Sequence, residues 1–230
     1  MTVAVVTDST AYLPEGVADR YGITVVPLHV VLGGATGREN LDLGPAEVAA
    51  ALAERRVQVT TSRPTPGEFA DAFRACGAAQ VVSVHLSSTL SGTAESAVLA
   101  ARAVASEGIE VRVVDSRSVA MGLGFPVVAA AEAAATGKGI RAVEGAAMRA
   151  AEATTTLLYV DTLEHLRRGG RVRAASALVG AALGVKPILT MTGGELVLLE
   201  KVRTSSKAVA RLLALSVAAA GESPVDVAVH

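Results

Sequence analysis

The sequence predicts an α/β protein built from two domains, one with a parallel sheet and one with antiparallel strands. Residues 3–153 alternate short β-branched runs with longer Ala-rich runs. This alternation is typical of a parallel sheet covered by helices on both faces. Later, two apolar runs flank Thr192-Gly193-Gly194, which is a hairpin signal. Because a tight hairpin pairs its strands antiparallel, we expect an α/β domain over residues 1–153 and an α+β domain over residues 154–230.

The composition argues against several classes of protein. Of the 230 residues, 51% are hydrophobic and 19% are charged, which excludes a disordered chain. A net charge of −1 and the absence of Trp argue against nucleic-acid binding. No apolar run reaches the roughly 18 residues of a membrane span. The amino terminus does not resemble a signal peptide, and a single cysteine, Cys76, fits a reducing compartment, so we expect a cytoplasmic location.

The elements of the first domain follow from residue type and turn chemistry. Short β-branched runs predict strands at residues 3–6, 23–32, 81–84 and 109–114. Longer runs predict helices at residues 13–21, 45–55, 66–76, 93–105, 119–135 and 140–153. Pro14 and Pro45 fall in the first turns of their helices, where no N–H is needed, whereas Pro27 indicates an edge or a bulge in its strand. Thr65 and Glu68 form a capping box at the start of the third helix.

The second domain loses this alternation of strand and helix. Strands are predicted at residues 155–160, 185–191, 195–202 and 225–229. Helices are predicted at residues 161–168, 174–183 and 204–219. The last strand is followed only by His230, which leaves a sheet edge to be covered. We therefore expect this domain to be incomplete at its carboxyl end.

Two segments rich in hydroxyl groups are the candidate binding residues. The first follows the strand at 81–84 and precedes a helix, and its hydroxyls are Ser87, Ser88, Thr89, Ser91 and Thr93. A turn between a parallel strand and a helix presents free N–H groups and the positive end of the helix dipole, which suits an anion. The absence of acidic residues and cysteine from this turn favours a hydrogen-bonding cradle over a metal site. The second segment, residues 60–62, is explained equally well by turn chemistry alone.

The remaining motifs do not define a catalytic centre. Asp8 and Asp115 each end a strand and are followed by Ser, and helix capping explains both. The Gly-Lys-Gly at residues 137–139 lacks the spacing of a P-loop. His85 could activate a nucleophilic serine, but no carboxylate is evident in the sequence to orient it. We therefore expect no catalytic residue, no metal and no cofactor.

Six motifs occur in a characteristic order. They are Val6-Thr7-Asp8-Ser9-Thr10, Thr61-Ser62-x-Pro64-x-Pro66-Gly67-Glu68-Phe69, His85-Leu86-Ser87-Ser88-x-Leu90-Ser91-Gly92-Thr93, Val114-Asp115-Ser116, Leu166-x-x-Gly169-Gly170-Arg171 and Lys186-Pro187-Ile188. Together they resemble the DegV family of bacterial fatty-acid-binding proteins, which includes the acyl-carrying subunits of fatty-acid kinase. The resemblance covers the whole chain. It implies a two-domain DegV-like fold with an acyl chain in an apolar tunnel between the domains and its carboxylate held by hydroxyls.

The resemblance also implies roles for particular residues. Thr61 and Ser91 are implied to bind the carboxylate. Further donors around it are expected at Ser62, Ser88, Gly92 and Thr93. Arg171 and Arg203 are implied to face the kinase subunit, although an exposed, solvated charge explains them as well. Arg63 stands where the family usually has Gln, and it either strengthens carboxylate attraction or points to solvent.

The expected function is to bind a long-chain fatty acid and present it to a separate ATP-dependent kinase subunit, which forms the acyl-phosphate. The resemblance implies that family members continue past the position of His230 with a Gly-rich segment, whose histidine also binds the carboxylate. We further expect a transient contact with a membrane surface. The alternative is an enzyme acting on a small phosphorylated metabolite, with the turn at Ser91–Thr93 as a phosphate cradle. A third interpretation is a regulatory or interaction protein whose ligand is incidental.

Overall fold

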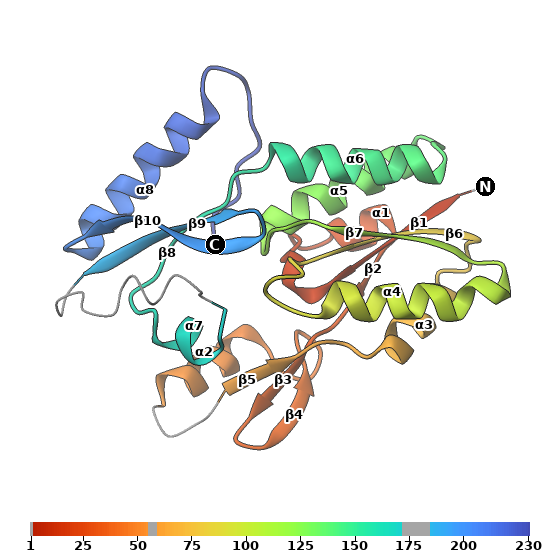
Figure 1. The fold of residues 1–230 in the computed structure, drawn as a ribbon, viewed down its shortest axis with the longest axis horizontal. Helices are drawn as coiled ribbons and strands as arrows, with labels where there is room; N and C mark the ends of the chain where they lie inside the picture. The colour runs from red at the N-terminus through yellow and green to blue at the C-terminus, as the bar shows by residue number, and fades with distance from the viewer. Residues whose placement is uncertain (1, 55–58, 172–184) are drawn as a thin grey trace. The chain divides into compact units, whose positions relative to one another are not determined.

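The structure is a computed structural model that describes residues 2–54, 59–171 and 185–230 (Figure 1). The chain divides into two compact units, Met1–Ala153 and Thr154–His230. The predicted fold class is confirmed, because a four-stranded parallel sheet with helices occurs in the first unit and an antiparallel sheet in the second.

The core of the first unit is a parallel sheet with the strand order β2-β1-β6-β7. Its strands are β1 (Val3–Asp8), β2 (Ile23–Val26), β6 (Gln80–His85) and β7 (Glu110–Asp115). The helices on one face are α1 (Val17–Tyr21), α5 (Met121–Ala135) and α6 (Ile140–Ala153). Those on the other face are α3 (Pro66–Ala75) and α4 (Thr93–Val104), as Figure 1 shows.

Burial on both faces explains why these strands read as nearly continuous apolar runs. Successive side chains of β1 point to opposite faces of the sheet. Val5 packs in a cluster with Leu123 of α5, whereas Val6 packs in a second cluster with Phe69 and Phe73 of α3. Each face of the sheet therefore has its own core.

Pro27 separates two sheets that the sequence did not distinguish. The run at 23–32, which we expected to be one strand, is β2 followed by a strand of a second, antiparallel sheet with the order β4-β3-β5. The strands of this second sheet are β3 (His29–Leu32), β4 (Ala35–Arg38) and β5 (Val59–Ser62). Because proline has no N–H for the ladder, the chain leaves the parallel sheet at this point. Gly33 and Gly34 both take positive φ, which allows the tight turn between β3 and β4.

The predicted helix starts are confirmed at two of three prolines. Helices α2 (Pro45–Ala53) and α3 both begin at proline. The capping box of α3 is present: the Thr65 N–H donates to Glu68 Oε2 at 2.7 Å, and the Glu68 N–H donates to Thr65 Oγ1 at 3.2 Å. Helix α1 is shorter than expected and begins at Val17, because Gly16 takes a left-handed conformation just before it. Single turns of 3₁₀-helix complete this unit, η1 (Ser9–Ala11) and η2 (Ala105–Glu107).

The second unit contains an antiparallel sheet with the order β10-β9-β8. Its elements are β8 (Leu157–Tyr159), α7 (Glu164–Arg168), β9 (Lys186–Thr192), β10 (Glu195–Val202) and α8 (Ser205–Ala220). The predicted hairpin at Gly193-Gly194 is confirmed. The helix predicted at 174–183 lies outside the described residues.

The strand predicted at 225–229 is wrong. These residues form no regular structure, and Val225, Val227 and Val229 are 52%, 72% and 89% exposed. Alternating valines favour a strand only where a neighbouring strand supplies hydrogen bonds and a buried face. Within the described ranges no strand pairs with this segment.

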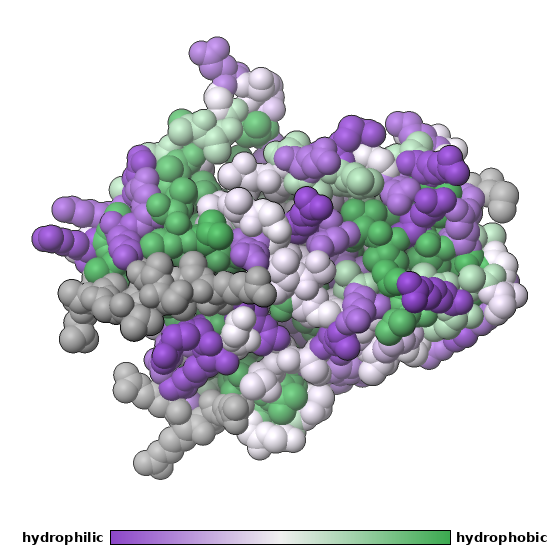
Figure 2. Space-filling model, viewed as in Figure 1, coloured by the Kyte–Doolittle hydropathy of each residue, from purple (hydrophilic) through white to green (hydrophobic). Residues whose placement is uncertain are grey.

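Helix α8 exposes apolar side chains on one face. Val209, Leu213 and Val217 recur at the helical spacing and are 57%, 66% and 64% exposed. Figure 2 shows apolar surface at the upper left, where α8 lies in Figure 1. Even so, none of the helices in the described parts of the chain has the length and apolar character needed to cross a bilayer.

Candidate functional site

The two hydroxyl-rich segments both lie in the first unit. The turn at residues 87–93 joins β6 to α4, at the carboxyl edge of the parallel sheet. Residues 60–62, which turn chemistry would explain equally well from the sequence, belong instead to strand β5. The expected relation between a parallel strand, a polar turn and a helix therefore holds for the first segment only.

Ser91 and Thr93 form a hydrogen-bonded pair at the start of α4. Their hydroxyl oxygens are 2.9 Å apart, and either can be the donor. Thr93 is completely buried, whereas Ser91 is partly exposed. A hydroxyl donates one hydrogen bond and accepts up to two. When Thr93 donates to Ser91, the proton of the Ser91 hydroxyl is therefore available to an acceptor from outside.

Gly92 is the N-cap of α4 and, because it has no side chain, cannot itself cap this end of the helix. Its carbonyl accepts from the Ser96 N–H at 3.0 Å, which begins the helical hydrogen bonding. The first amides of a helix have no partner within it and lie at the positive end of its dipole. The Ser91 hydroxyl thus stands beside backbone donors that favour a negative group.

The Ser88 hydroxyl is directed to a carboxylate of the protein itself. It donates to Asp115 Oδ2 at 2.6 Å, and the Ser88 N–H donates to the same oxygen at 3.3 Å. Asp115 also accepts from the Arg117 N–H at 2.8 Å. Ser88 therefore fastens the turn to the end of β7, and in this arrangement its proton is not available to a ligand.

Thr61 and Ser62 point to opposite faces of the small sheet, because successive residues of a strand alternate. Thr61 pairs with Val30, and Val30 pairs with Gly37 of β4. A Cβ atom added to Gly37 would lie 2.7 Å from Leu43 Cδ1, so the Leu43 side chain covers this face. Cross-strand partners share a face. The Thr61 hydroxyl therefore lies on the apolar face with Val30 and Leu43.

Ser62 instead shares its face with His29, its partner in β3. The His29 imidazole contacts the Glu68 carboxylate at 2.9 Å. Burial raises the pKa of Glu68, but hydrogen bonds from Thr65 and His29 outweigh this effect, so the pKa lies below its usual value. This contact ties β3 to the first turn of α3.

Arg63 connects the two hydroxyl-rich segments. Its Nη1 atom is 2.7 Å from Glu95 Oε2 and 3.4 Å from the Gly92 carbonyl oxygen. The guanidinium is about half exposed and is paired with a carboxylate of α4. The ion pair holds the end of the Thr61-Ser62 segment beside the start of that helix.

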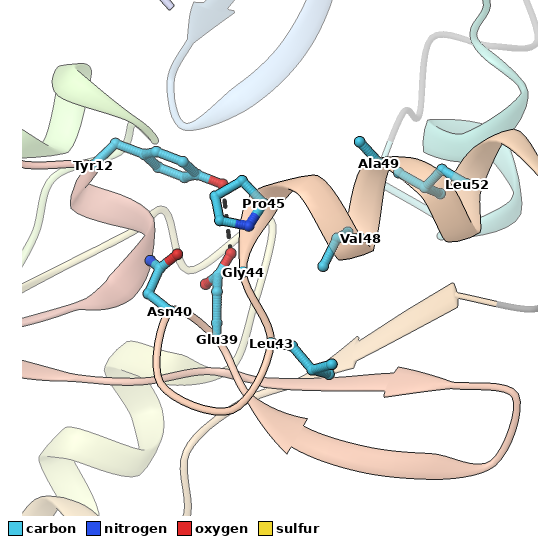
Figure 3. Close-up of a pocket in the computed structure, with 9 residues that line it drawn as sticks. All are labelled: Tyr12, Glu39, Asn40, Leu43, Gly44, Pro45, Val48, Ala49 and Leu52. Carbon is cyan, nitrogen blue, oxygen red and sulfur yellow. Dashed lines mark hydrogen bonds between the residues drawn. The ribbon is translucent and has the colours of Figure 1, made fainter.

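A cavity of about 150 Å³ opens between α2 and the residues around Glu39 (Figure 3). Its lining residues are mainly apolar: Tyr12, Glu39, Asn40, Leu43, Gly44, Pro45, Val48, Ala49 and Leu52. Glu39 is the acidic member, and it accepts hydrogen bonds from Ser9 at 2.5 Å and from Tyr12 at 3.4 Å. Burial, together with the neighbouring Glu39, raises the pKa of Tyr12. The cavity is therefore suited to an apolar group and unfavourable for an anion.

A buried hydroxyl, imidazole and carboxylate form a network that sequence reasoning missed. His85 Nδ1 is 3.0 Å from Asp8 Oδ2, and His85 Nε2 is 2.6 Å from Ser83 Oγ. All three side chains are completely buried. The expectation that no carboxylate orients His85 is therefore wrong. The signal available in the sequence was that Asp8 and His85 both end predicted strands of one parallel sheet.

The hydrogen bonds of this network join the same residue types as a Ser-His-Asp catalytic triad, but a substrate cannot reach its serine. A triad serine must reach a substrate carbonyl, whereas Ser83 lies in the interior of β6 with no exposed surface. The Asp8 carboxylate also accepts from the Leu86 N–H at 3.1 Å. The network therefore fixes the end of β6 directly before the hydroxyl turn.

The two arginines implied to face a kinase lie in the second unit. Arg171 is exposed and donates to the Gly169 carbonyl in the turn after α7. Arg203 is exposed between β10 and α8. Among the described residues, no group of three or more His, Cys, Asp or Glu side chains is arranged to hold a metal ion.

Comparison with known proteins relates the chain to a family. A family model described as uncharacterised proteins of the DegV family matches residues 2–230. A DegV domain-containing protein of Streptomyces coelicolor is 51% identical over 231 residues, which cover 99% of this chain and 81% of that protein.

Two solved structures share both fold and sequence with the chain. A fatty-acid-binding DegV family protein from Thermus thermophilus is 36% identical with a TM-score of 0.87, covering 96% of this chain and 79% of that one. DegV from Bacillus subtilis, also described as a fatty-acid-binding protein, is 35% identical with a TM-score of 0.84, covering 94% and 77%. Both support a relationship through the fold as well as through the sequence.

Proposed function

The chain belongs to the DegV family, and on this basis we propose that it binds a long-chain fatty acid whose carboxylate is held by Thr61 and Ser91. One observation supports this assignment above the others. Arg63, next to the Thr61-Ser62 segment, hydrogen-bonds at the first turn of α4, so the two hydroxyl segments that the resemblance assigns to the carboxylate are neighbours. The fatty-acid-binding relatives supply the class of ligand.

The head group is held by donors rather than by a buried cation. The Ser91 hydroxyl, supported by Thr93, donates to one carboxylate oxygen, and the exposed Thr61 hydroxyl donates to the carboxylate as well. The Gly92 amide and the helix dipole add to the attraction. Hydrogen bonds to a charged group contribute about 1.5–3 kcal/mol each, enough to offset desolvation of the carboxylate.

The acyl chain lies on the apolar face of the small sheet. Thr61 shares this face with Val30 and Leu43, and Leu43 also lines the cavity beside α2. Glu39 repels a carboxylate from the cavity, which therefore receives methylene groups. A cavity of about 150 Å³ holds a molecule the size of benzene, so it takes only part of the chain. At about 0.8 kcal/mol per methylene, twelve buried methylenes would contribute on the order of 10 kcal/mol before association costs.

The chain presents the carboxylate to a separate ATP-dependent kinase subunit instead of reacting with it. The exposed Arg171 and Arg203 are suited to contact that subunit, since arginine is enriched at interfaces. Reversing the charge with Arg203→Glu should abolish acyl-phosphate formation by the kinase without changing fatty-acid affinity. Transfer of palmitate from lipid vesicles tests the accompanying transient contact with a membrane surface.

The experiment compares palmitate with hexadecanol, which has the same chain length but no carboxylate. Thr61→Ala and Ser91→Ala should each weaken palmitate binding by about tenfold or more and leave hexadecanol affinity unchanged. Thr60→Ala is the matched control, because Thr60 pairs with Val31 and so points to the other face of the same strand. Equal losses for palmitate and hexadecanol would contradict the head-group assignment. Binding of inorganic phosphate without binding of palmitate would favour an enzyme acting on a phosphorylated metabolite.

A further inference from the structure

The first turns of α2, α3 and α4 each contain a glutamate, but its side chain does not bind the same partner in all three helices. Each helix has Glu at its third position, where the side chain can reach back to the N-cap amide. In α2 the Gly44 N–H donates to Glu47 at 2.8 Å, and in α3 the Thr65 N–H donates to Glu68 at 2.7 Å. Two of the three helices therefore cap themselves.

Helix α4 is not capped by its own glutamate. The third residue of this helix, Glu95, accepts a hydrogen bond from the Arg63 guanidinium instead, at 2.7 Å between Oε2 and Nη1. In the part of the chain that the structure describes, no capping box closes on the Gly92 N–H, unlike the N-cap amides of α2 and α3. The open amide is next to Ser91, which is a head-group residue in the function proposed above.

The glycine at the N-cap makes room for this arrangement. Gly92 has φ −76° and ψ 16°, which a residue with a side chain also adopts. A Cβ atom at this position, however, would lie 1.7 Å from Arg63 Nη1 and 2.8 Å from its Cζ. A side chain at this position would therefore displace the guanidinium of Arg63, although the backbone conformation would accept it.

We propose that Arg63 is a positioning residue that holds the Glu95 carboxylate away from the Gly92 amide and so keeps the start of α4 open for the carboxylate of the ligand. Without Arg63, Glu95 turns back as Glu47 and Glu68 do. An internal carboxylate then occupies the donors that a fatty acid would use. This inference rests on the proposed function, because it assumes that the ligand carboxylate binds at this helix end.

The contribution of the ion pair to stability is expected to be small. The side chains of Arg63 and Glu95 are 48% and 67% exposed, and ion pairs with this exposure add little to stability. The consequence of losing Arg63 is therefore expected in ligand affinity and in the protection of one amide, not in unfolding.

The test uses Arg63→Ala, Glu95→Ala, the double variant and Gly92→Ala. The control is Arg74→Ala, which removes another exposed ion pair, that of Arg74 with Glu107. Arg63→Ala should weaken palmitate binding by about tenfold and leave hexadecanol unaffected. Adding Glu95→Ala should restore affinity, because the side chain at position 95 can then no longer reach the Gly92 amide. Gly92→Ala keeps every charge but displaces the guanidinium, so it should weaken palmitate in the same way.

Hydrogen exchange of the Gly92 amide in the ligand-free protein is a second measurement. The exchange rate would not change if Arg63 only stabilised the fold. The amide should become protected in Arg63→Ala and lose that protection in the double variant. If the double variant binds palmitate as weakly as Arg63→Ala, or if Gly92→Ala binds like the parent chain, the charge of Arg63 alone is responsible and the inference is wrong. If the parent chain binds no palmitate, the proposed function itself fails.

Discussion

The buried carboxylate of Asp8 should be among the most costly polar groups to remove. It accepts from Thr10 N–H at 3.1 Å and Thr10 Oγ1 at 2.5 Å, from His85 Nδ1 at 3.0 Å and from Leu86 N–H at 3.1 Å. Asp8→Ala leaves the His85 and Leu86 donors buried without an acceptor. Leaving a buried donor without an acceptor costs about 1–3 kcal/mol, and since two donors lose their acceptor here we expect a loss of about 2–6 kcal/mol.

Asp8→Asn tests the charge and the hydrogen bonds of Asp8 while leaving its packing unchanged. Asparagine has the same shape as aspartate, but an NH₂ donor replaces one of the two carboxylate oxygens, and this donor then faces either Thr10 or Leu86. One mismatched buried pair costs about 1–3 kcal/mol, so this variant should lie between the parent and Asp8→Ala. Asp71→Asn is the matched control on the exposed face of α3, where a change within about 0.5 kcal/mol is expected.

The assay is urea unfolding followed by far-UV circular dichroism, with hydrogen exchange of the Leu86 amide as a local measure. Faster exchange at Leu86 should accompany the loss of stability, because this amide loses its acceptor. The same variants should weaken palmitate binding, since Leu86 leads directly into the hydroxyl turn. A loss of less than about 1 kcal/mol for Asp8→Ala, below the cost expected for unpaired buried donors, would refute this reasoning.

Three further outcomes are expected. Thr93→Val should weaken palmitate binding about fivefold through loss of one hydrogen bond, whereas Thr136→Val, at the end of α5, should have no effect in the same titration. Folding lowers the pKa of Glu68, so the ionised Glu68 carboxylate stabilises the fold above its usual pKa, and this stabilisation is lost as the pH falls through the lowered value. In Glu68→Gln, the urea midpoint should therefore fall less steeply at acid pH than in the parent chain. Val48→Asp, in the cavity lining, should weaken palmitate more than octanoate, whereas Ala50→Asp on the same helix should affect neither.

Local signals in the sequence predicted much of the fold. The capping box at Thr65, the prolines that begin α2 and α3, and the hairpin at Gly193-Gly194 all appear in the structure as expected. Each depends on residues a few positions apart, so the sequence alone carries the information. The strands of the parallel sheet were also evident, because burial on both faces makes them continuously apolar.

Contacts between distant residues were not predictable in this way. Asp8 and His85 are 77 positions apart, and their contact depends on β1 and β6 being neighbours in the sheet. Arg63 and Glu95 are 32 positions apart, and the sequence did not indicate that they meet. Pro27 indicates an edge or a bulge in the sequence, whereas its role in dividing two sheets follows only from the pairing of β3 with β4 and β5.

In the candidate site, too, the sequence predicted features that depend on neighbouring residues but not contacts between residues far apart in the chain. Composition and turn chemistry located the hydroxyls of residues 87–93, and the resemblance narrowed the anion from a phosphate to a carboxylate. The structure adds that Ser88 is bonded to Asp115 and that Ser62 points away from the Thr61 face. The alternating valines at 225–229 misled the prediction, because a pattern that suits a strand does not supply a neighbouring strand.

The most direct test of the central claim is the lipid content of the purified chain. Denaturing extraction followed by mass spectrometry should find a long-chain fatty acid, and chain stripped of lipid should take up palmitate or oleate. Thr61→Ala combined with Ser91→Ala should reduce the amount retained. A chain that carries no acyl species and takes up neither fatty acid would contradict the proposed function.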